Sequence, residues 1–354
     1  MTVLPPLVDE QALAQYLAVQ LPGENAGAAI TTERISGGHS NETFIIRRGE
    51  GVTRETWVLR RPPRGPLLPT AHDVGREYRV INALHKTDVP VPAPILFCSD
   101  ESIIGAPFYL MQYIPGVVVR KKVPEAFARP QDRAAMAEEL IQTLVKLHAV
   151  DWRAIGLENL GKPEGYLERQ LKRWTGQLDK SRHRPLPELD AVSEWLRLNL
   201  PESPPATLVH GDYRIDNVIY TAEPPAQILG VLDWEMATIG DPLADLGYLL
   251  SHWREAGDPP VAVTSELADV TEQPGFPTRA QLAERYRELS GRAVKNLNFY
   301  EALAIWKLAI LLEGNYVRYL AGTTDDHFYA LLDEGVPALA RRALEVTQRA
   351  DYGE

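Results

Sequence analysis

Cysteine is almost absent from this sequence: among its 354 residues, Cys98 is the only one. A single cysteine cannot form an intrachain disulfide, and it cannot build a cysteine-based zinc site. A chain without disulfides is typical of the reducing cytosol. We therefore expect a cytoplasmic protein.

Long hydrophobic runs and blocks of positive charge are also missing. The longest apolar runs, such as LAILL at 308–312, are far too short to span a bilayer, and residues 1–21 lack the basic stretch of a signal peptide. The net charge is −11, which argues against a nucleic-acid or anionic-membrane partner, because both bind cationic surfaces. With 45% hydrophobic and 24% charged residues, the chain is an ordinary globular protein of one large domain or two lobes, whose expected partners are small molecules.

The hydrophobic patterning changes along the chain. A short helix is predicted at 9–20, and β-rich segments are predicted at 28–35, 42–48, 56–61, 92–99 and 106–116, with a helix between them at 74–86. Long helical patterns follow at 131–150, 163–179, 279–290 and 299–321. The break falls near QYIPG at 112–116, so we predict an N-terminal lobe at 1–113 and a helical C-terminal lobe at 114–354.

The stretch LVHGDYRIDNVIY at 208–220 places polar residues between two short apolar runs. A hairpin with a polar turn would explain it, since Gly, Asp and Asn are common turn residues. However, Asn217 follows Asp212 by five residues, which is the spacing of the catalytic loop of kinases, and an apolar strand ends at Asp233, sixteen residues after Asn217. In kinases a magnesium-binding aspartate lies at such a place.

With these stretches the chain resembles the aminoglycoside phosphotransferase-like kinases, a branch of the protein-kinase-like fold that includes choline kinases. The resemblance depends on ISGGHSNETFII at 35–46, VLRRPP at 58–63, LMQYIPG at 110–116, the 208–220 stretch and GVLDWEMATIGDPLADLGYLL at 230–250. VLRRPP and EGYLERQLKRW together look most like the kinase-like domains associated with acyl-CoA dehydrogenases. The resemblance implies an α+β, two-lobed protein-kinase-like fold, with a small β-rich N-terminal lobe and a larger, mainly helical C-terminal lobe.

The resemblance also implies roles for the polar residues. Asp212 would be the catalytic base, and Asn217 and Asp233 would hold Mg²⁺ between the β- and γ-phosphate oxygens of ATP. Phosphoryl transfer requires positioning and charge neutralisation, which oxygen ligands and one base can supply.

The loop SGGHSN would lie over the phosphates. Gly37 and Gly38 would let backbone amides approach the phosphate oxygens, and Ser40 and Asn41 would add donors. The loop lacks a full G-x-G-x-x-G, and alone it would be read as an ordinary hairpin.

Two further segments would bind the nucleotide. Arg60 stands where other kinases have a lysine, and its helix partner would be Glu77; alternatively, both are surface residues. The backbone of Gln112, Tyr113 and Ile114 would bind the purine edge. Backbone contacts do not distinguish ATP from GTP through any side chain, and ATP is the expected nucleotide.

Other polar residues have structural interpretations. His210 is expected to hydrogen-bond backbone near Asp233, while Asp241 and Asp245 are expected to cap and brace a helix from Pro242. The stretch GLENLGKP at 156–163 begins like a Walker A loop, but Pro163 stands where Ser or Thr is required, so we predict a plain loop.

A protein kinase has a long activation segment where this chain has only seven residues, between Asp233 and Asp241. The acceptor is therefore expected to be a small hydroxylated molecule. Residues 251–330 hold 11 acidic and 8 basic side chains, Lys307 among them, interleaved with aromatic residues; this mixture suits an amphipathic or anionic hydroxylated acceptor at least as well as a polycation. The resemblance to the kinase-like domains associated with acyl-CoA dehydrogenases points the same way, so a hydroxyacid or a hydroxyacyl thioester is expected. The alternatives are an aminoglycoside-modifying phosphotransferase and a catalytically silent nucleotide-binding module.

Overall fold

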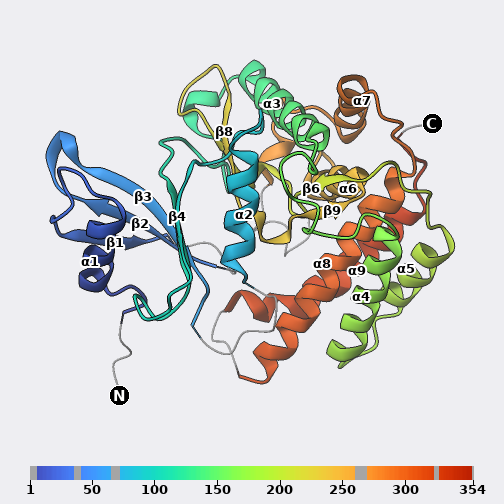
Figure 1. Cartoon of the computed structure of the whole chain (residues 1–354). Helices are drawn as coiled ribbons and strands as arrows, with labels where there is room; N and C mark the ends of the chain where they lie inside the picture. The colour runs from blue at the N-terminus through green and yellow to red at the C-terminus, as the bar shows by residue number, and fades with distance from the viewer. Residues whose placement is uncertain (1–5, 36–40, 65–71, 260–268, 323–326, 353–354) are drawn as a thin grey trace. The chain divides into compact units, whose positions relative to one another are not determined.

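The computed structural model describes residues 6–35, 41–64, 72–259, 269–322 and 327–352. Its contacts divide the chain into two compact units (Figure 1). The first unit contains Met1–Pro115 together with Leu229–Glu235, and the second contains Gly116–Ile228 and Met236–Glu354.

The first unit is built around an antiparallel sheet of order β1-β2-β3-β5-β4. Its elements are α1 (Glu10–Gln20), β1 (Ile30–Arg34), β2 (Glu42–Arg48), β3 (Glu55–Arg61), α2 (Val74–Leu84), β4 (Pro94–Cys98) and β5 (Phe108–Gln112). Strand β2 alternates buried and partly buried side chains, as a strand with one face on a core does. Leu13 and Leu17 of α1 are buried in the same core as Ile46 and Leu59 of the sheet, and α2 contacts β4 and β5.

The second unit is mainly helical. Its helices are α3 (Pro130–Ala149), α4 (Tyr166–Ser181), α5 (Pro187–Leu198), α6 (Pro242–His252), α7 (Arg279–Ser290), α8 (Leu297–Leu320) and α9 (Leu332–Thr347). Two short strands, β6 (Thr207–Val209) and β9 (Thr238–Gly240), pair antiparallel, and β7 (Val218–Tyr220) pairs with β8 (Ile228–Val231). Helix α8 contacts α4, α5, α6 and α9, so it forms the centre of this unit (Figure 1).

Helices α6 and α8 approach each other closely at Gly247. A Cβ atom at this position would lie 2.4 Å from Cβ of Tyr300, so only glycine allows the approach. The Tyr300 hydroxyl donates to Asp241 Oδ2 at 2.8 Å, and Asp241 also caps the N-terminus of α6 by accepting from the Leu243 amide. These contacts fix α6, and with it the residues that α6 presents to the 208–220 loop.

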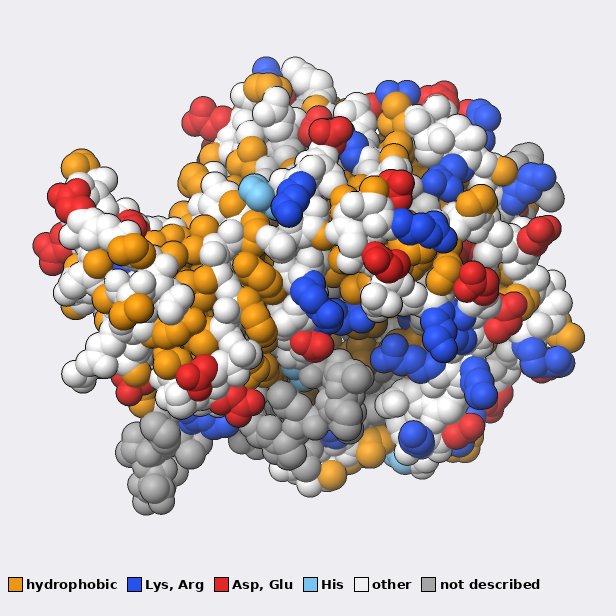
Figure 2. Space-filling model, in the orientation of Figure 1, with side chains coloured by type: hydrophobic (Ala, Val, Ile, Leu, Met, Phe, Trp, Pro, Cys, Tyr) orange, Lys and Arg blue, Asp and Glu red, His pale blue; other side chains and the backbone are white. Residues whose placement is uncertain are grey.

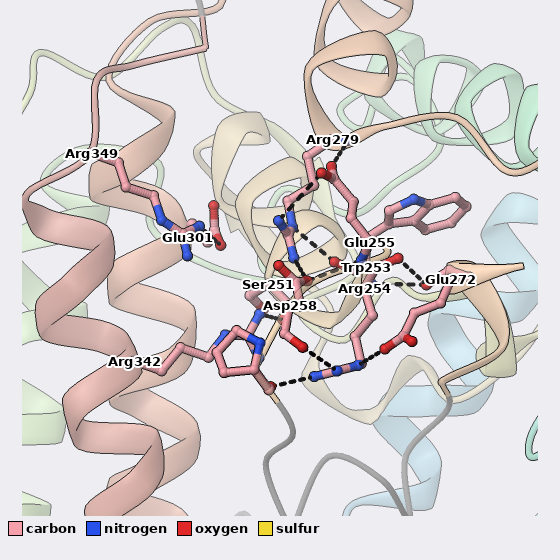
Figure 3. Close-up of polar contacts among 12 residues, drawn as sticks. Ser251, Trp253, Arg254, Glu255, Asp258, Glu272, Arg279, Glu301, Arg342 and Arg349 are labelled. Atoms are coloured by element: carbon pink, nitrogen blue, oxygen red, sulfur yellow. Dashed lines mark hydrogen bonds and ion pairs between the residues drawn. The ribbon is translucent and has the colours of Figure 1, made fainter.

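Charged side chains hold the segment after α6 in place (Figure 3). Arg279 donates to the Trp253 carbonyl at 2.8 Å and pairs with Asp258, while Arg254 pairs with Glu272 at 2.5 Å. Arg342 of α9 donates to the Ser251 carbonyl at 2.7 Å. Since buried charges need such partners, this cluster ties α6, α7 and α9 together.

Most of the predicted elements are confirmed, and so is the α+β composition. The helix predicted at 163–179 begins later, at Tyr166, after Gly165 with φ of 62°. Residues 156–163 form a loop, as predicted. Helices α5 and α9 were not predicted from the sequence. Among the residues that the structure describes, no helix combines the length and hydrophobicity needed to cross a membrane.

Candidate active site

The loop at 208–220 begins where buried strand β6 ends, at Val209. Gly211 has φ of +84°, and a Cβ atom there would lie 2.8 Å from the Met236 carbonyl oxygen, so the turn requires glycine. A short 3₁₀ turn, Ile215–Asn217, then leads into β7. Two buried strands therefore hold both ends of a polar loop.

Asp245 of α6 anchors this loop. Its carboxylate accepts from the backbone amides of His210 at 2.6 Å and Gly211 at 2.7 Å, and its Oδ2 lies 3.3 Å from His148 Nε2. Burial opposes the negative charge, but the hydrogen bond from His148 and the backbone amides keep the pKa of Asp245 below its usual value. The expectation that Asp245 braces its own helix was wrong, because its side chain instead positions the start of the loop.

Asn217 holds the Asp212 carboxylate. The Asn217 Nδ2 group donates to the Asp212 carbonyl and to Asp212 Oδ2, both at 2.8 Å. The Asp212 side chain is 22% exposed to solvent, so a substrate can reach it. Both Nδ2 hydrogens face Asp212, which leaves the Asn217 Oδ1 oxygen for another ligand.

Arg214 lies between two carboxylates of the loop. Its Nε atom is 3.4 Å from Asp212 Oδ1 and 3.2 Å from Asp216 Oδ1. Burial raises the pKa of Asp216, and the Arg214 charge opposes that effect. His210 is fully buried, and its Nδ1 accepts from the Asp212 amide at 3.2 Å. The ring therefore supports the loop backbone at Asp212, while the expected hydrogen bond to backbone near Asp233 stays a prediction.

Two further side chains of the second unit, Tyr248 and His252, lie near Asp212, and the sequence analysis did not identify them. The Tyr248 ring lies against His252, with centroids 4.4 Å apart. Burial, and then the negative charge of Asp212, raise the pKa of Tyr248 well above its usual value. Lys307 of α8 also lies close enough to Asp212 for the carboxylate to influence its pKa. The helical spacing of Tyr248 and His252 resembles that of core residues, so no sequence signal separated them from the core.

In the first unit, Arg60 of β3 contacts two carboxylates. Its Nη1 atom lies 3.0 Å from Glu77 Oε1, and its Nη2 atom lies 3.3 Å from Asp233 Oδ1. Burial opposes the cation, but Glu77 and Asp233 raise the pKa of Arg60 above its usual value. Asn41 Nδ2 donates to Glu77 Oε2 at 3.4 Å. The predicted pairing of Arg60 with Glu77 is therefore present, and the surface alternative is wrong because both side chains are buried.

Asp233 stands in an unusual backbone conformation, with φ of 66°. Such a φ is uncommon for a residue other than glycine and is often found at functional sites. Its side chain is 28% exposed, and one carboxylate oxygen faces Arg60, so the other is available to a ligand.

The segment after β5 has free backbone groups. The Gln112 amide donates to the Ala93 carbonyl at 2.8 Å. Tyr113 and Ile114 make no backbone hydrogen bond to another residue in the described ranges of the chain. Gly230 makes room for Ile114, because a Cβ atom there would lie 2.8 Å from Ile114 Cδ1. The backbone of this segment can therefore bind an external partner.

Three residues of the predicted phosphate loop, Gly37, Gly38 and Ser40, lie outside the described residues. Asn41, at the end of this loop, is buried beside Glu77.

The oxygen atoms of Asn217 and Asp233 suit Mg²⁺. Within the described ranges, no three His, Cys, Asp or Glu side chains gather in a way that could hold a metal ion. Mg²⁺ does not need such a group, because it commonly binds proteins through one or two side-chain oxygens together with water and phosphate oxygens. The donors present therefore fit the metal.

Comparison with known proteins identifies the family of the chain. The model of the phosphotransferase enzyme family matches residues 31–285. Acyl-CoA dehydrogenase family member 11 of Gallus gallus is 37% identical over 351 residues, which are 97% of this chain and 44% of that protein. The chain thus spans less than half the length of this relative, and the predicted resemblance to kinase-like domains associated with acyl-CoA dehydrogenases is confirmed.

Solved structures share the fold. The crystal structure of a candidate aminoglycoside phosphotransferase from Ralstonia eutropha JMP134 has a TM-score of 0.80 and 31% identity, covering 96% of this chain and 98% of that one. Spectinomycin phosphotransferase, solved with ADP and spectinomycin, has a TM-score of 0.60 and 12% identity, covering 95% and 98%. The protein-kinase-like fold predicted from the sequence is confirmed, and the chain belongs to the phosphotransferase enzyme family.

Proposed function

We propose that the protein is an ATP- and Mg²⁺-dependent small-molecule kinase that transfers the γ-phosphate to a hydroxyl group. The main support for the proposal is that Asn217 donates two hydrogen bonds of 2.8 Å to Asp212. These bonds fix an accessible carboxylate in one orientation. A general base needs this combination of fixed geometry and access.

In the proposed reaction, the acceptor hydroxyl oxygen forms a bond to the γ-phosphorus of ATP. The bond from that phosphorus to the β,γ-bridging oxygen breaks, ADP leaves, and the hydroxyl proton passes to Asp212 Oδ. Arg214, held between Asp212 and Asp216, supplies positive charge beside the base. Such fixed charges stabilise the developing charge of the transferred group.

The first unit would bind the nucleotide. Arg60, oriented by Glu77, would contact phosphate oxygens through its planar guanidinium. Asn41, together with Gly37, Gly38 and Ser40, would add donors to the phosphates. ADP in the structure of spectinomycin phosphotransferase supports the use of a nucleotide.

The adenine ring would bind the backbone of Tyr113 and Ile114, next to Gln112, whose amide already donates to the Ala93 carbonyl. Backbone contacts alone do not distinguish adenine from guanine. We propose ATP because it is the more common phosphate donor.

Asn217 and Asp233 would hold Mg²⁺ through the oxygens described above. When bound, the metal neutralises charge on the β- and γ-phosphates. The two residues themselves determine how strongly the protein retains the metal–nucleotide complex.

A small acceptor is favoured over a protein. Helix α6 begins at Pro242, nine residues after Asp233, which leaves no room for a long peptide-binding activation segment. We propose a hydroxyacid or a hydroxyacyl thioester as the acceptor class, in keeping with the name of the relative acyl-CoA dehydrogenase family member 11. The single cysteine supports the reducing cytoplasm as the compartment.

An aminoglycoside phosphotransferase is the second candidate, because two structural neighbours carry names of antibiotic phosphotransferases. A screen for ADP release across hydroxyacids, hydroxyacyl thioesters, amino alcohols and aminoglycosides separates the candidates. We expect turnover with an acid or thioester. Turnover with kanamycin-like acceptors alone would contradict the proposed acceptor, and nucleotide binding without turnover on any acceptor would indicate a catalytically silent module.

A further inference from the structure

Lys307 lies on α8 seven residues after Tyr300, which is close to two helical turns. The two residues therefore share one face of the helix, and Tyr300 on that face contacts Asp241 at the start of α6. The Lys307 ammonium also approaches α4, because its Nζ atom lies 5.6 Å from the centroid of the Trp174 ring. Lys307 thus lies among α4, α6 and α8.

The Lys307 ammonium has no anionic partner in contact. No hydrogen bond or ion pair joins it to another residue in the part of the chain that the structure describes, although the side chain is partly buried. Other inward cations of the same unit are paired: Arg184 contacts Glu313 at 2.9 Å, and Arg279 pairs with Asp258. A partly buried cation without a partner is costly, so its position calls for a ligand.

Charges at longer range describe the surroundings of Lys307. Burial is the main influence and lowers the pKa of Lys307 to about 8; Arg173 of α4 lowers it as well, while Asp245 of α6 and the catalytic-loop Asp212 oppose the shift. Helix α8 packs on α6, and Asp245 of α6 binds the backbone just before Asp212, so Lys307 and the proposed base belong to the same packed region of the second unit.

Helix α4, which carries Trp174, also has exposed positive side chains. Figure 2 shows Lys and Arg side chains over the face formed by α4, where Arg169, Lys172 and Arg173 are exposed. This face would repel a polycation and attract an anion.

We propose that Lys307 and the Trp174 ring form the subsite for an oxyanion of the acceptor, a carboxylate or a phosphate, while the acceptor hydroxyl faces Asp212. The proposal rests on the kinase function proposed above. The ammonium pairs with the oxyanion, and the indole ring packs against the carbon chain between the oxyanion and the hydroxyl. Lys307 is in this sense a specificity-determining residue of phosphoryl transfer.

The test compares Lys307→Met and Lys307→Arg with the wild type, using Lys180→Met, an exposed position on α4, as the matched control. The acceptors are a hydroxyacid, its neutral amide and its coenzyme A thioester. For the hydroxyacid, we expect Lys307→Met to raise KM about 10-fold or more with kcat and the KM of ATP little changed, as expected for loss of one charge-assisted contact. Lys307→Arg should recover part of the loss, and the neutral amide should be used equally by wild type and Lys307→Met.

The thioester identifies the source of the oxyanion. If Lys307→Met raises the KM of the thioester as much as that of the acid, Lys307 binds a phosphate of coenzyme A. If only the KM of the acid rises, Lys307 binds the carboxylate.

In the wild type, KM for the bound anion should rise above pH 8, and this rise should be absent in Lys307→Met. The facing groups Arg173, Asp245 and Asp212 are the same in both proteins.

An equal change of KM for charged and neutral acceptors in Lys307→Met, or no change for either, would overturn the subsite. Failure of the kinase proposal would look different: the wild type would release no ADP with any acceptor. In that case the proteins are titrated calorimetrically with the hydroxyacid alone. If the wild type binds the hydroxyacid and Lys307→Met does not, the subsite is supported. If the wild type does not bind it, the subsite is refuted. Melting temperatures confirm that each variant is folded.

Discussion

The Asp245 carboxylate accepts a hydrogen bond of 2.6 Å from the backbone amide of His210. A second oxygen of the same carboxylate accepts from Gly211, so a side chain of α6 fixes the backbone just before Asp212. The orientation of the proposed base therefore depends on a residue that needs no contact with either substrate.

Asp245→Asn should impair both stability and transfer. The asparagine replaces one charged acceptor with an NH₂ group that cannot accept from an amide, so we expect a loss of about 1.5–3 kcal/mol in the free energy of unfolding. In the folded variant kcat should fall more than ATP affinity does. The matched control is Asp190→Asn on α5, an exposed carboxylate that pairs with Arg182 at the surface. Equal kcat values for the two variants would contradict the anchoring role.

Arg60 should contribute to ATP binding through both its charge and its shape. Arg60→Ala should weaken ATP binding about 10- to 100-fold, and Arg60→Lys less, because lysine keeps the charge and loses the planar fork. Calorimetric titration with ATP measures both. Arg60→Ala also leaves Glu77 buried without its cation, which can cost about 3–5 kcal/mol of stability. The double variant Arg60→Met/Glu77→Gln removes both charges, and ATP binding as tight as in the wild type would exclude Arg60 from the nucleotide site.

His252 should make stability depend on pH. Burial, and then the Arg214 charge, lower the pKa of His252 to about 4 in the folded protein, against 6.5 in an unfolded chain. Between these values the unfolded state binds the proton and the folded state does not, so stability is lost as the pH falls from 6.5 toward 4, by up to about 1.4 kcal/mol per pH unit. Other facing charges are Asp212 and Arg342.

His252→Phe keeps a ring beside Tyr248 and removes the titration. Urea unfolding between pH 4 and pH 7 should show a flatter pH dependence for this variant than for the wild type. Identical slopes would mean that His252 titrates normally in the folded protein.

The charge cluster of Figure 3 should contribute to stability but not to nucleotide binding. Asp258→Asn removes the anion that faces buried Arg279, and we expect a loss of about 1–3 kcal/mol in the free energy of unfolding. Arg287→Gln, which breaks an exposed pair with Glu284 on α7, is the control and should have no measurable effect. A stability of Asp258→Asn equal to that of the control would show that the cluster is dispensable.

The sequence predicted what depends on local patterns. The strands around Arg60, the helix that carries Glu77, and the loop from His210 to Asn217 all have strong periodicity or motif spacing, and each is found in the structure. The role of Asp245 could not be predicted, because it depends on how α6 packs beside the loop. On a helix, an anchoring aspartate and a capping aspartate look alike. Helices α5 and α9 were missed for a related reason: tertiary packing, more than local propensity, stabilises helices in proteins.

The most direct test of the account is Asp212→Asn. Phosphoryl transfer and ATP binding are measured on the same folded protein, with the acceptor found in the ADP-release screen. The change removes the proposed base and keeps Asn217 and Asp233, so kcat should fall about 10²- to 10⁴-fold while ATP affinity in the presence of Mg²⁺ stays within about 3-fold of the wild type. Near-normal turnover by folded Asp212→Asn would contradict the proposed function.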